Sequence, residues 1–230
     1  MFIDRMSLSR KGEMEMGLNT GFDPDEIRNA IQNVNNSYND LCNALGSQFQ
    51  DKFVSFMSQN WACQEAQEFF SNVVEPTMTD LRQNVDTIFE SVVTAMDTAA
   101  FNWANQTGNT GIYSRSAFDK SSQNIDVSII RENIDNVRGI NDNCMSEAET
   151  NLAQVTSDSE NALEAAINGV VSSGFIGGDQ QANLTNSLNQ IKANIENSLN
   201  ELVNQFKNAV DETIQKYNIA EFKASTAFEG

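Results

Sequence analysis

The chain has 230 residues, and its 32 acidic side chains against 14 basic ones give it a formal net charge of −18. A surface this acidic repels nucleic-acid phosphates and anionic lipid headgroups, which argues against nucleic-acid binding and against electrostatic membrane docking. The sequence contains no apolar run of about 18 residues, so a membrane-spanning helix is not expected. The length suits one large domain or two small ones.

Residues that commonly perform catalysis or hold metals are scarce. Histidine, the commonest general base and metal ligand, is absent. The cysteines Cys42, Cys63 and Cys144 are odd in number and share no CxxC spacing, which favours small buried residues in a reducing compartment over a redox pair or a disulfide. The carboxylates fall on the polar faces of expected helices and do not follow the spacing of a calcium loop. We therefore predict no catalytic residue, no metal site and no cofactor, and we do not expect an enzyme.

Residues 1–22 are predicted to be a flexible N-terminal arm. They show no helical period, hold four of the eight methionines, and lack the apolar core and cleavage site of a secretory signal. The arm is either disordered or becomes ordered on a partner, since Met-rich surfaces suit adaptable contacts. Synthesis in the cytoplasm without a cleavable signal is expected.

A first helical hairpin is predicted over residues 23–105. Its first helix opens at "GFDPDEI", where Asp23 can act as the N-cap, Pro24 suits the first helical position and Glu26 completes a capping box. Apolar residues then recur at steps of three or four, the spacing of one helix face. These positions are Ile27, Ile31, Val34, Tyr38, Leu41, Leu45, Phe49, Phe53 and Phe56.

The chain is expected to reverse at "NWACQ", where Trp61 is followed two positions later by Cys63. A bulky aromatic can close the end of the hairpin core, and a small residue lets the chain turn. The second helix follows with an apolar stripe up to Trp103, and Pro76 within it predicts a kink or a local loss of hydrogen bonding. The aromatic residues around the turn are interpreted as core, with an exposed docking patch as the alternative. They are Phe49, Phe53, Phe56, Phe69 and Phe70.

A linker is predicted over residues 106–124, where the helical period gives way to Gly, Ser, Thr and Asn. A second hairpin is predicted over residues 125–221. Asp126 would cap its first helix, "SSGFIGGD" would form its turn, and the apolar stripe of its last helix would end at Tyr217. Residues 222–230 would be a C-terminal tail.

The two hairpins are predicted to be an internal duplication. A shift of 114 residues places the stripe of the second helix on that of the fourth; the pairs are Leu81 and Ile195, Val85 and Leu199, Ile88 and Leu202, Val92 and Phe206, and Trp103 and Tyr217. A shift of 103 places the start of the first helix on that of the third; the pairs are Ile27 and Ile130, Arg28 and Arg131, Ile31 and Ile134, and Val34 and Val137. The two shifts differ by 11 residues, about three helical turns, so the stripe stays in phase. Trp61 would then correspond to Phe175 at the second turn, and Cys63 to Gly177.

These elements predict an all-α fold in which two long helical hairpins form an elongated four-helix bundle. Each hairpin is apolar on one face, so the two can bury those faces against each other. Hairpins packed within one chain and hairpins swapped between two chains satisfy the pattern equally, and the oligomeric state stays open.

A hairpin of two long helices with Trp-small-Gly at its turn resembles the WXG family. These are the early-secreted-antigen-like small proteins that type VII secretion systems of Gram-positive bacteria and mycobacteria export. "NWACQEAQEFF" carries the match, and residues 23–105 cover the family's usual length. Cys63 stands where the family has Gly. The second hairpin, with "GFIGG" at its turn, resembles the family more weakly, so the chain is similar to two such units fused.

The resemblance also implies an export signal. Family members carry a Tyr followed four positions later by an acidic residue, just after the hairpin, and "YNIAE" from Tyr217 to Glu221 fits that pattern. The alternative is that Tyr217 is a terminal core residue. In the family's dimers the turn of one unit lies near the signal end of the other, so Trp61 and Tyr217 are expected at the same end of the bundle.

Two functions are compatible with these patterns. The first is a non-enzymatic helical binding protein, resembling a WXG-like protein that a Gram-positive-type system secretes and that acts as a chaperone-like partner or an effector. The second is a structural subunit of a larger assembly, such as a phage virion, a tail-like particle or a surface layer. Both imply protein partners, either the secretion machinery or assembly neighbours. The turn residues Trp61, Cys63, Phe175 and Gly177 are the candidate contacts.

Overall fold

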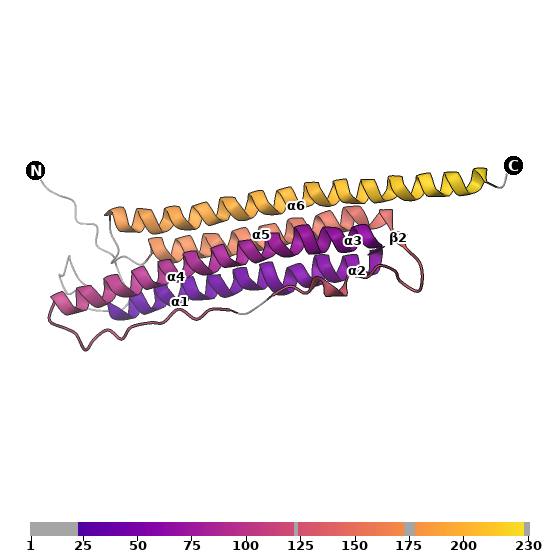
Figure 1. Cartoon of the computed structure of the whole chain (residues 1–230). Helices are drawn as coiled ribbons and strands as arrows, with labels where there is room; N and C mark the ends of the chain where they lie inside the picture. Colours follow the sequence, from indigo (N-terminus) through magenta and orange to yellow (C-terminus); the bar gives the residue numbers. More distant parts are fainter. Residues whose placement is uncertain (1–22, 122–123, 173–177, 228–230) are drawn as a thin grey trace, which may run out of the picture.

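Residues 23–121, 124–172 and 178–227 are described by the computed structural model, in which four long helical arms lie side by side in an elongated bundle (Figure 1). The first arm comprises α1 (Pro24–Asn43), the π-helical segments η1 (Ala44–Gln48) and η2 (Gln50–Ser55), and α2 (Phe56–Asn60). The second comprises α3 (Gln64–Phe69), the π-helical η3 (Phe70–Val74) and α4 (Glu75–Gln106). The third is α5 (Met145–Val171) and the fourth is α6 (Gly178–Thr226). The predicted all-α four-helix bundle is confirmed.

The short elements lie at one end of the bundle and in the connection between the hairpins. Strand β1 (Trp61–Ala62) joins the first two arms and pairs in antiparallel register with β2 (Gly139–Ile140). Two 3₁₀ turns, η4 (Val127–Ile129) and η5 (Asp142–Cys144), flank β2 along the chain. We call the end of the bundle that holds β1 and β2 the turn end.

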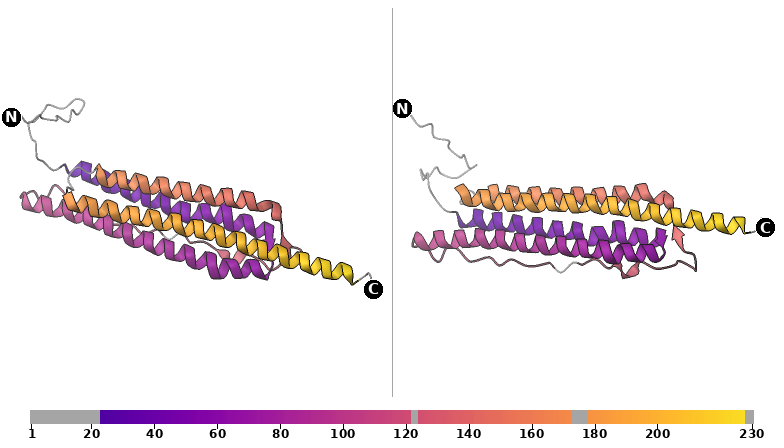
Figure 2. Two further views of the ribbon diagram at one scale, coloured as in Figure 1. Left: turned by 90° about the horizontal axis from the view of Figure 1, so that it is seen from above. Right: turned by 45° about the horizontal axis from the view of Figure 1, so that its top comes forward.

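The neighbouring arms are antiparallel throughout (Figures 1 and 2). α1 packs against α4 and α5, and α6 packs against the same two helices from the other side of the bundle. α1 and α6 run toward the turn end, whereas α4 and α5 run away from it. The two hairpins of one chain therefore cover each other's apolar faces, as expected for the arrangement without a swap.

The start of α1 follows the predicted capping pattern. The Asp23 carboxylate accepts hydrogen bonds from the backbone amides of Asp25 at 2.9 Å and Glu26 at 3.3 Å. These are amides that the helix itself cannot pair, so the cap satisfies them. Pro76 lies in the first turn of α4, directly after η3, so the predicted local change in hydrogen bonding coincides with the junction between π and α geometry.

The helix predicted to start at Asp126 begins only at Met145, and this boundary was wrong. Asp126 caps the single 3₁₀ turn of η4, its carboxylate accepting from the Ser128 amide at 2.9 Å. A tight β-turn then forms at Asp135 and Asn136, which both adopt positive φ, 51° and 68°. Asp and Asn favour this two-residue turn geometry because their short polar side chains tolerate it. Local turn chemistry thus overrides the apolar spacing.

The second hairpin consequently spans residues 145–226 instead of 125–221, since α6 continues into the expected tail. The shift of 103 has no structural counterpart: Ile31 and Val34 are buried in α1, whereas Ile134 lies beside the β-turn and Val137 is 68% exposed. The shift of 114 agrees with burial, because Leu81, Val85 and Val92 are buried and so are Ile195, Leu199 and Phe206.

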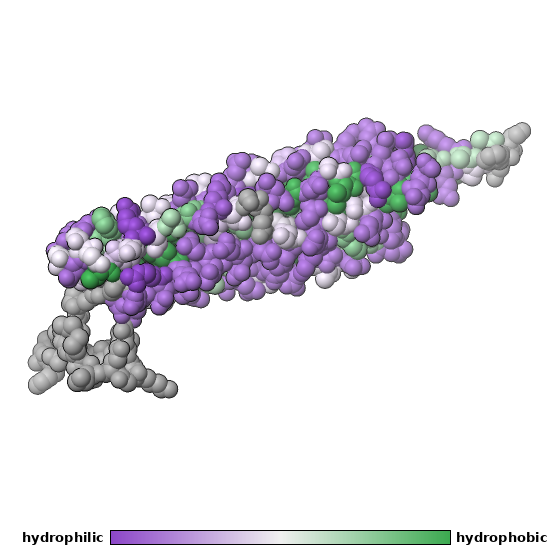
Figure 3. All heavy atoms as spheres, turned by 90° about the horizontal axis from the view of Figure 1, so that it is seen from below, coloured by the Kyte–Doolittle hydropathy of each residue, from purple (hydrophilic) through white to green (hydrophobic). Residues whose placement is uncertain are grey.

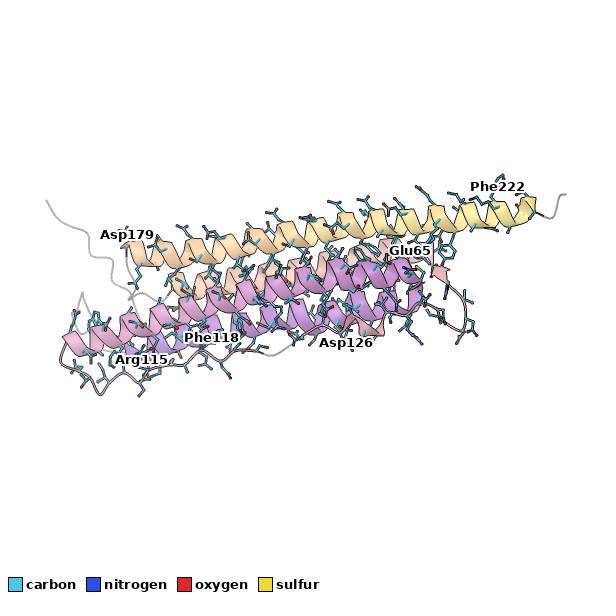
Figure 4. All side chains as sticks on the ribbon, viewed as in Figure 1. Glu65, Arg115, Phe118, Asp126, Asp179 and Phe222 are labelled. Carbon is cyan, nitrogen blue, oxygen red and sulfur yellow. The ribbon has the colours of Figure 1, made fainter. Side chains whose placement is uncertain are left out.

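The predicted linker is an extended segment that is fastened along the first hairpin. We call residues 107–121 the strap. It leaves α4 at the end away from the turn and runs back along the outside of α1 and α4 (Figure 1). Tyr113 is buried in it, and the Phe118 ring packs edge-on against Tyr38 with centroids 4.7 Å apart. Figure 4 shows Arg115 and Phe118 on this segment.

Two buried carboxylates of α4 anchor the strap. Asp97 accepts hydrogen bonds from the Tyr113 hydroxyl at 3.1 Å, the Arg115 Nε at 2.6 Å and the Ser116 amide at 2.6 Å. Asp86 accepts from the Tyr38 hydroxyl at 2.7 Å and pairs with the Lys120 ammonium at 2.9 Å. Buried charge is costly unless it is paired and hydrogen-bonded, and here the strap supplies the charged partners Arg115 and Lys120.

Candidate functional site

Trp61 lies at the reversal between α2 and α3, in extended backbone, and is fully buried. Its ring contacts Phe69 of α3 at 5.7 Å and Phe206 of α6 at 6.1 Å between centroids. The turn aromatic therefore closes the core of both hairpins, not only its own. Phe49, Phe53, Phe69 and Phe70 are buried and Phe56 is partly buried, so the core interpretation of this aromatic group is confirmed.

Cys63 is buried just after β1, and its φ of −170° is extended backbone that any residue adopts. The chain reversal thus requires no glycine at this position, and Cys63 is accommodated without backbone strain. Burial raises the pKa of the Cys63 thiol. The thiol is therefore kept neutral and packs as a small apolar group.

Tyr217 is half-buried on α6 at the turn end, and burial is the main reason that its pKa is raised. An ion pair between Lys216 of α6 and Glu65 of α3 lies beside it, and the hydrogen bond from Lys216 lowers the pKa of Glu65. The fold brings Trp61, Cys63 and Tyr217 to one end of the bundle. Glu221 is exposed one helical turn beyond Tyr217.

The second predicted turn falls outside the described residues. α5 ends at Val171 and α6 begins at Gly178, and Phe175 and Gly177 fall in the interval between them that the structure does not describe. Nothing in the described residues relates Phe175 to Trp61.

A groove of about 710 Å³ opens at the turn end between the 134–142 segment and the end of α6. Its apolar lining is Ala62, Ile134, Val137, Ile140, Ile214 and Tyr217. Asp135, Arg138 and Asp142 lie on its rim, and the side-chain Nδ2 of Asn141 donates a hydrogen bond of 3.0 Å to Asn60 Oδ1. Sequence periodicity missed this groove because residues 134–142 were assigned to a helix. The adjacent Asp135 and Asn136, followed by Gly139, were the available turn signal.

α6 extends past the other three arms at the turn end (Figures 1 and 2). All residues from Asn218 to Ala227 are exposed. Two large apolar side chains stand on this projection, Ile219 at 55% and Phe222 at 69% exposure, and Figure 4 shows Phe222 far along it.

The face of the molecule in Figure 3 is mostly polar in its described part, with apolar patches between polar side chains. A smaller groove of about 380 Å³ runs between α4 and α6 and is lined largely by Asn, Ser, Thr, Asp and Glu. In the described ranges no three Cys, Asp or Glu side chains are grouped to hold a metal ion. No described helix combines the length and the hydropathy that a membrane span requires.

Comparison of the chain with models of protein families, with curated proteins and with solved structures finds no match in any of the three.

Proposed function

We propose that the chain is a non-enzymatic helical binding protein that a protein export machinery recognises at the turn end, as the resemblance to type VII-secreted WXG proteins implies. It would act as a chaperone-like partner or an effector through protein contacts. One observation carries the proposal: the Trp61 turn and the Tyr217–Glu221 segment lie at the same end of the bundle, joined by the Lys216–Glu65 ion pair. The Tyr217–Glu221 segment would thus be presented at the recognition end, with the buried Trp61 ring forming the core of that end.

Export of Tyr217→Ala from a Gram-positive host with a type VII system tests the proposal. We expect export to be lost while the protein accumulates, folded, in the cells. Trp103→Ala is the matched control, because it removes a half-buried aromatic from the other end of the bundle. Unimpaired export of Tyr217→Ala would refute the signal.

The acidic member of the signal has its own control pair. Glu221→Ala and Glu212→Ala each remove an exposed carboxylate from α6, one inside the Tyr-x-x-x-acidic pattern and one outside it. Loss of export in the first variant alone supports recognition of the pattern. Equal export of the two variants contradicts it.

The projecting end of α6 favours the second candidate, a structural subunit of a larger assembly. Exposed Ile219 and Phe222 would suit repeated contacts between neighbours. Light scattering over a concentration series distinguishes the two: a constant mass near 25.4 kDa favours the binding protein. A mass that grows with concentration, and that deletion of residues 1–22 lowers, favours the subunit.

A further inference from the structure

The groove at the turn end has one wall that is longer than the rest of the bundle. On α6, Tyr217 and Asn218 line the groove. Glu221 and Phe222 follow them by four residues, so they lie on the same face of the helix one turn further on. This wall therefore continues past the end of the other arms, and no other helix of the described residues lies beside it there (Figure 2). A helix laid there would continue the bundle.

The opposite wall is equally accessible. Val137 stands at the β-turn with 68% of its surface exposed, and Ile134 and Ile140 lie with it along the groove. The turn is held in place by paired backbone hydrogen bonds between Ile134 and Val137, at 2.8 and 2.9 Å, and by β2 on β1. An apolar groove with fixed walls on both sides fits the packing of an amphipathic helix.

The charges around the groove select the partner. Asp135 and Asp142 lie on its rim and take part in no ion pair among the described residues. Arg138 is neutralised by Glu132 at 2.7 Å, and Lys216 by Glu65. Glu221 adds a third carboxylate on the α6 wall. A second copy of the chain carries the same formal net charge of −18, so repulsion between the two chains disfavours a homodimer.

We propose that this groove binds an amphipathic helix of a protein partner, one whose apolar face is flanked by Lys or Arg. The proposal rests on the proposed function, that the chain works by binding protein, and adds the chemistry of the partner. Apolar side chains would pack between Val137 and Phe222, and the basic flanks would face Asp135 and Asp142.

A labelled synthetic Leu/Lys peptide of about 14 residues, close to four turns of amphipathic helix, is a suitable probe for fluorescence anisotropy with the full chain at about 0.15 M salt. We expect saturable binding that Val137→Glu and Phe222→Glu each weaken by about tenfold or more. Val171→Glu is the matched control, since it adds the same charge at another exposed apolar position, 52% exposed, at the far end of the bundle. It should change the affinity by less than about twofold.

Equal weakening by all three substitutions would overturn the proposal, because the loss of an exposed apolar side chain at the far end would then matter as much as a loss at the groove. Equal binding of a Leu/Glu peptide, or no binding of the Leu/Lys peptide, would overturn it as well. Asp135→Asn with Asp142→Asn should lower the affinity several-fold and reduce its salt dependence. If the groove fails these tests while Tyr217→Ala still blocks export, the proposed function stands without the groove.

Discussion

The Tyr38 hydroxyl of α1 donates a hydrogen bond of 2.7 Å to Asp86 of α4, and the same oxygen accepts the Ser121 amide of the strap at 2.9 Å. One buried hydroxyl thus ties both helices of the first hairpin to the segment that crosses them. Burial and the Asp86 hydrogen bond both raise the pKa of Tyr38, so the group stays a neutral donor.

Tyr38→Phe should lower the free energy of unfolding by about 1–2 kcal/mol, because a buried carboxylate and a strap amide each lose a partner. Urea denaturation measures the change, and hydrogen exchange at the Ser121 amide should accelerate. Tyr217→Phe is the control, since no described group bonds its hydroxyl, and it should leave the stability nearly unchanged. A Tyr38→Phe protein as stable as the parent would exclude this three-way tie.

Asp97→Ala should destabilise the chain by about 2–3 kcal/mol, because the carboxylate accepts three hydrogen bonds, two of them from strap side chains. The exposed Arg115 partner keeps the loss below that of a fully buried ion pair. Glu90→Ala, an exposed position on the same helix, should change the stability by less than about 0.5 kcal/mol. Limited proteolysis should cut the strap faster in the Asp97 variant alone, and equal cleavage would mean that the strap does not depend on this anchor.

The stability should fall in strong alkali through the tyrosines. Burial, with Asp97 nearby, raises the pKa of Tyr113 to about 12, above the value near 10 of an unfolded chain. The stabilisation from neutral Tyr113 is therefore complete below about pH 10 and is lost as the pH rises through about 12. Urea denaturation at about pH 9 and about pH 11 should show this loss, and Tyr113→Phe should reduce it. A pH dependence unchanged by Tyr113→Phe would assign it to other groups.

Cys63→Gly should destabilise the chain by about 1–2 kcal/mol. The extended φ of −170° gives glycine no advantage, while the substitution removes a buried side chain and adds backbone entropy to the unfolded state. Cys63→Ala keeps the Cβ atom and should cost less. Thermal unfolding of the three proteins decides the order, and a Gly variant above the parent would show that the turn is strained.

Gly169 marks the closest packing of α5 on α1, where an added Cβ would lie 3.1 Å from Val34 Cγ2. Gly169→Leu should cost about 1–3 kcal/mol through overpacking. Gly169→Ala should change the stability by less than about 1 kcal/mol, because its helix propensity offsets the tight contact. In a Val34→Ala background the same Gly169→Ala change should become stabilising. Denaturation of the parent, Gly169→Ala, Val34→Ala and the double variant measures the coupling between the two positions. Additive changes in the free energy of unfolding would exclude the contact.

The helices were predictable where a long apolar period had no competitor. Asp23 and the stripes of α1, α4 and α6 follow from spacing and capping alone. The prediction of a helix over residues 125–144 was wrong because Ile130, Ile134 and Val137 repeat at helical steps, while Asp135 and Asn136 form a turn between them. The helical spacing of the apolar residues and the turn preference of Asp135 and Asn136 conflicted, and the turn formed.

The candidate site could be predicted only in part. The shared end of Trp61 and Tyr217 was expected from the family resemblance, whereas the groove depends on where residues 134–142 fold back. Only one feature of the sequence indicates that the strap is anchored. Asp86 and Asp97 stand three helical turns apart beside the apolar residues Val85 and Met96. Acidic residues next to a core stripe require partners, but nothing in their spacing says which distant residues supply them.

The spacing of the two anchor residues along the strap matches the spacing of their partners along α4. Asp86 and Asp97 are 11 residues apart on the helix, which is about 16.5 Å at 1.5 Å per residue. Their partners Lys120 and Arg115 are five residues apart on extended chain, which is also about 16.5 Å at 3.3 Å per residue. Two chain geometries with different rises thus coincide at both anchors. Insertion or deletion of one residue between Arg115 and Lys120 would displace one anchor by about 3.3 Å. This segment should therefore tolerate substitutions but not changes in its length.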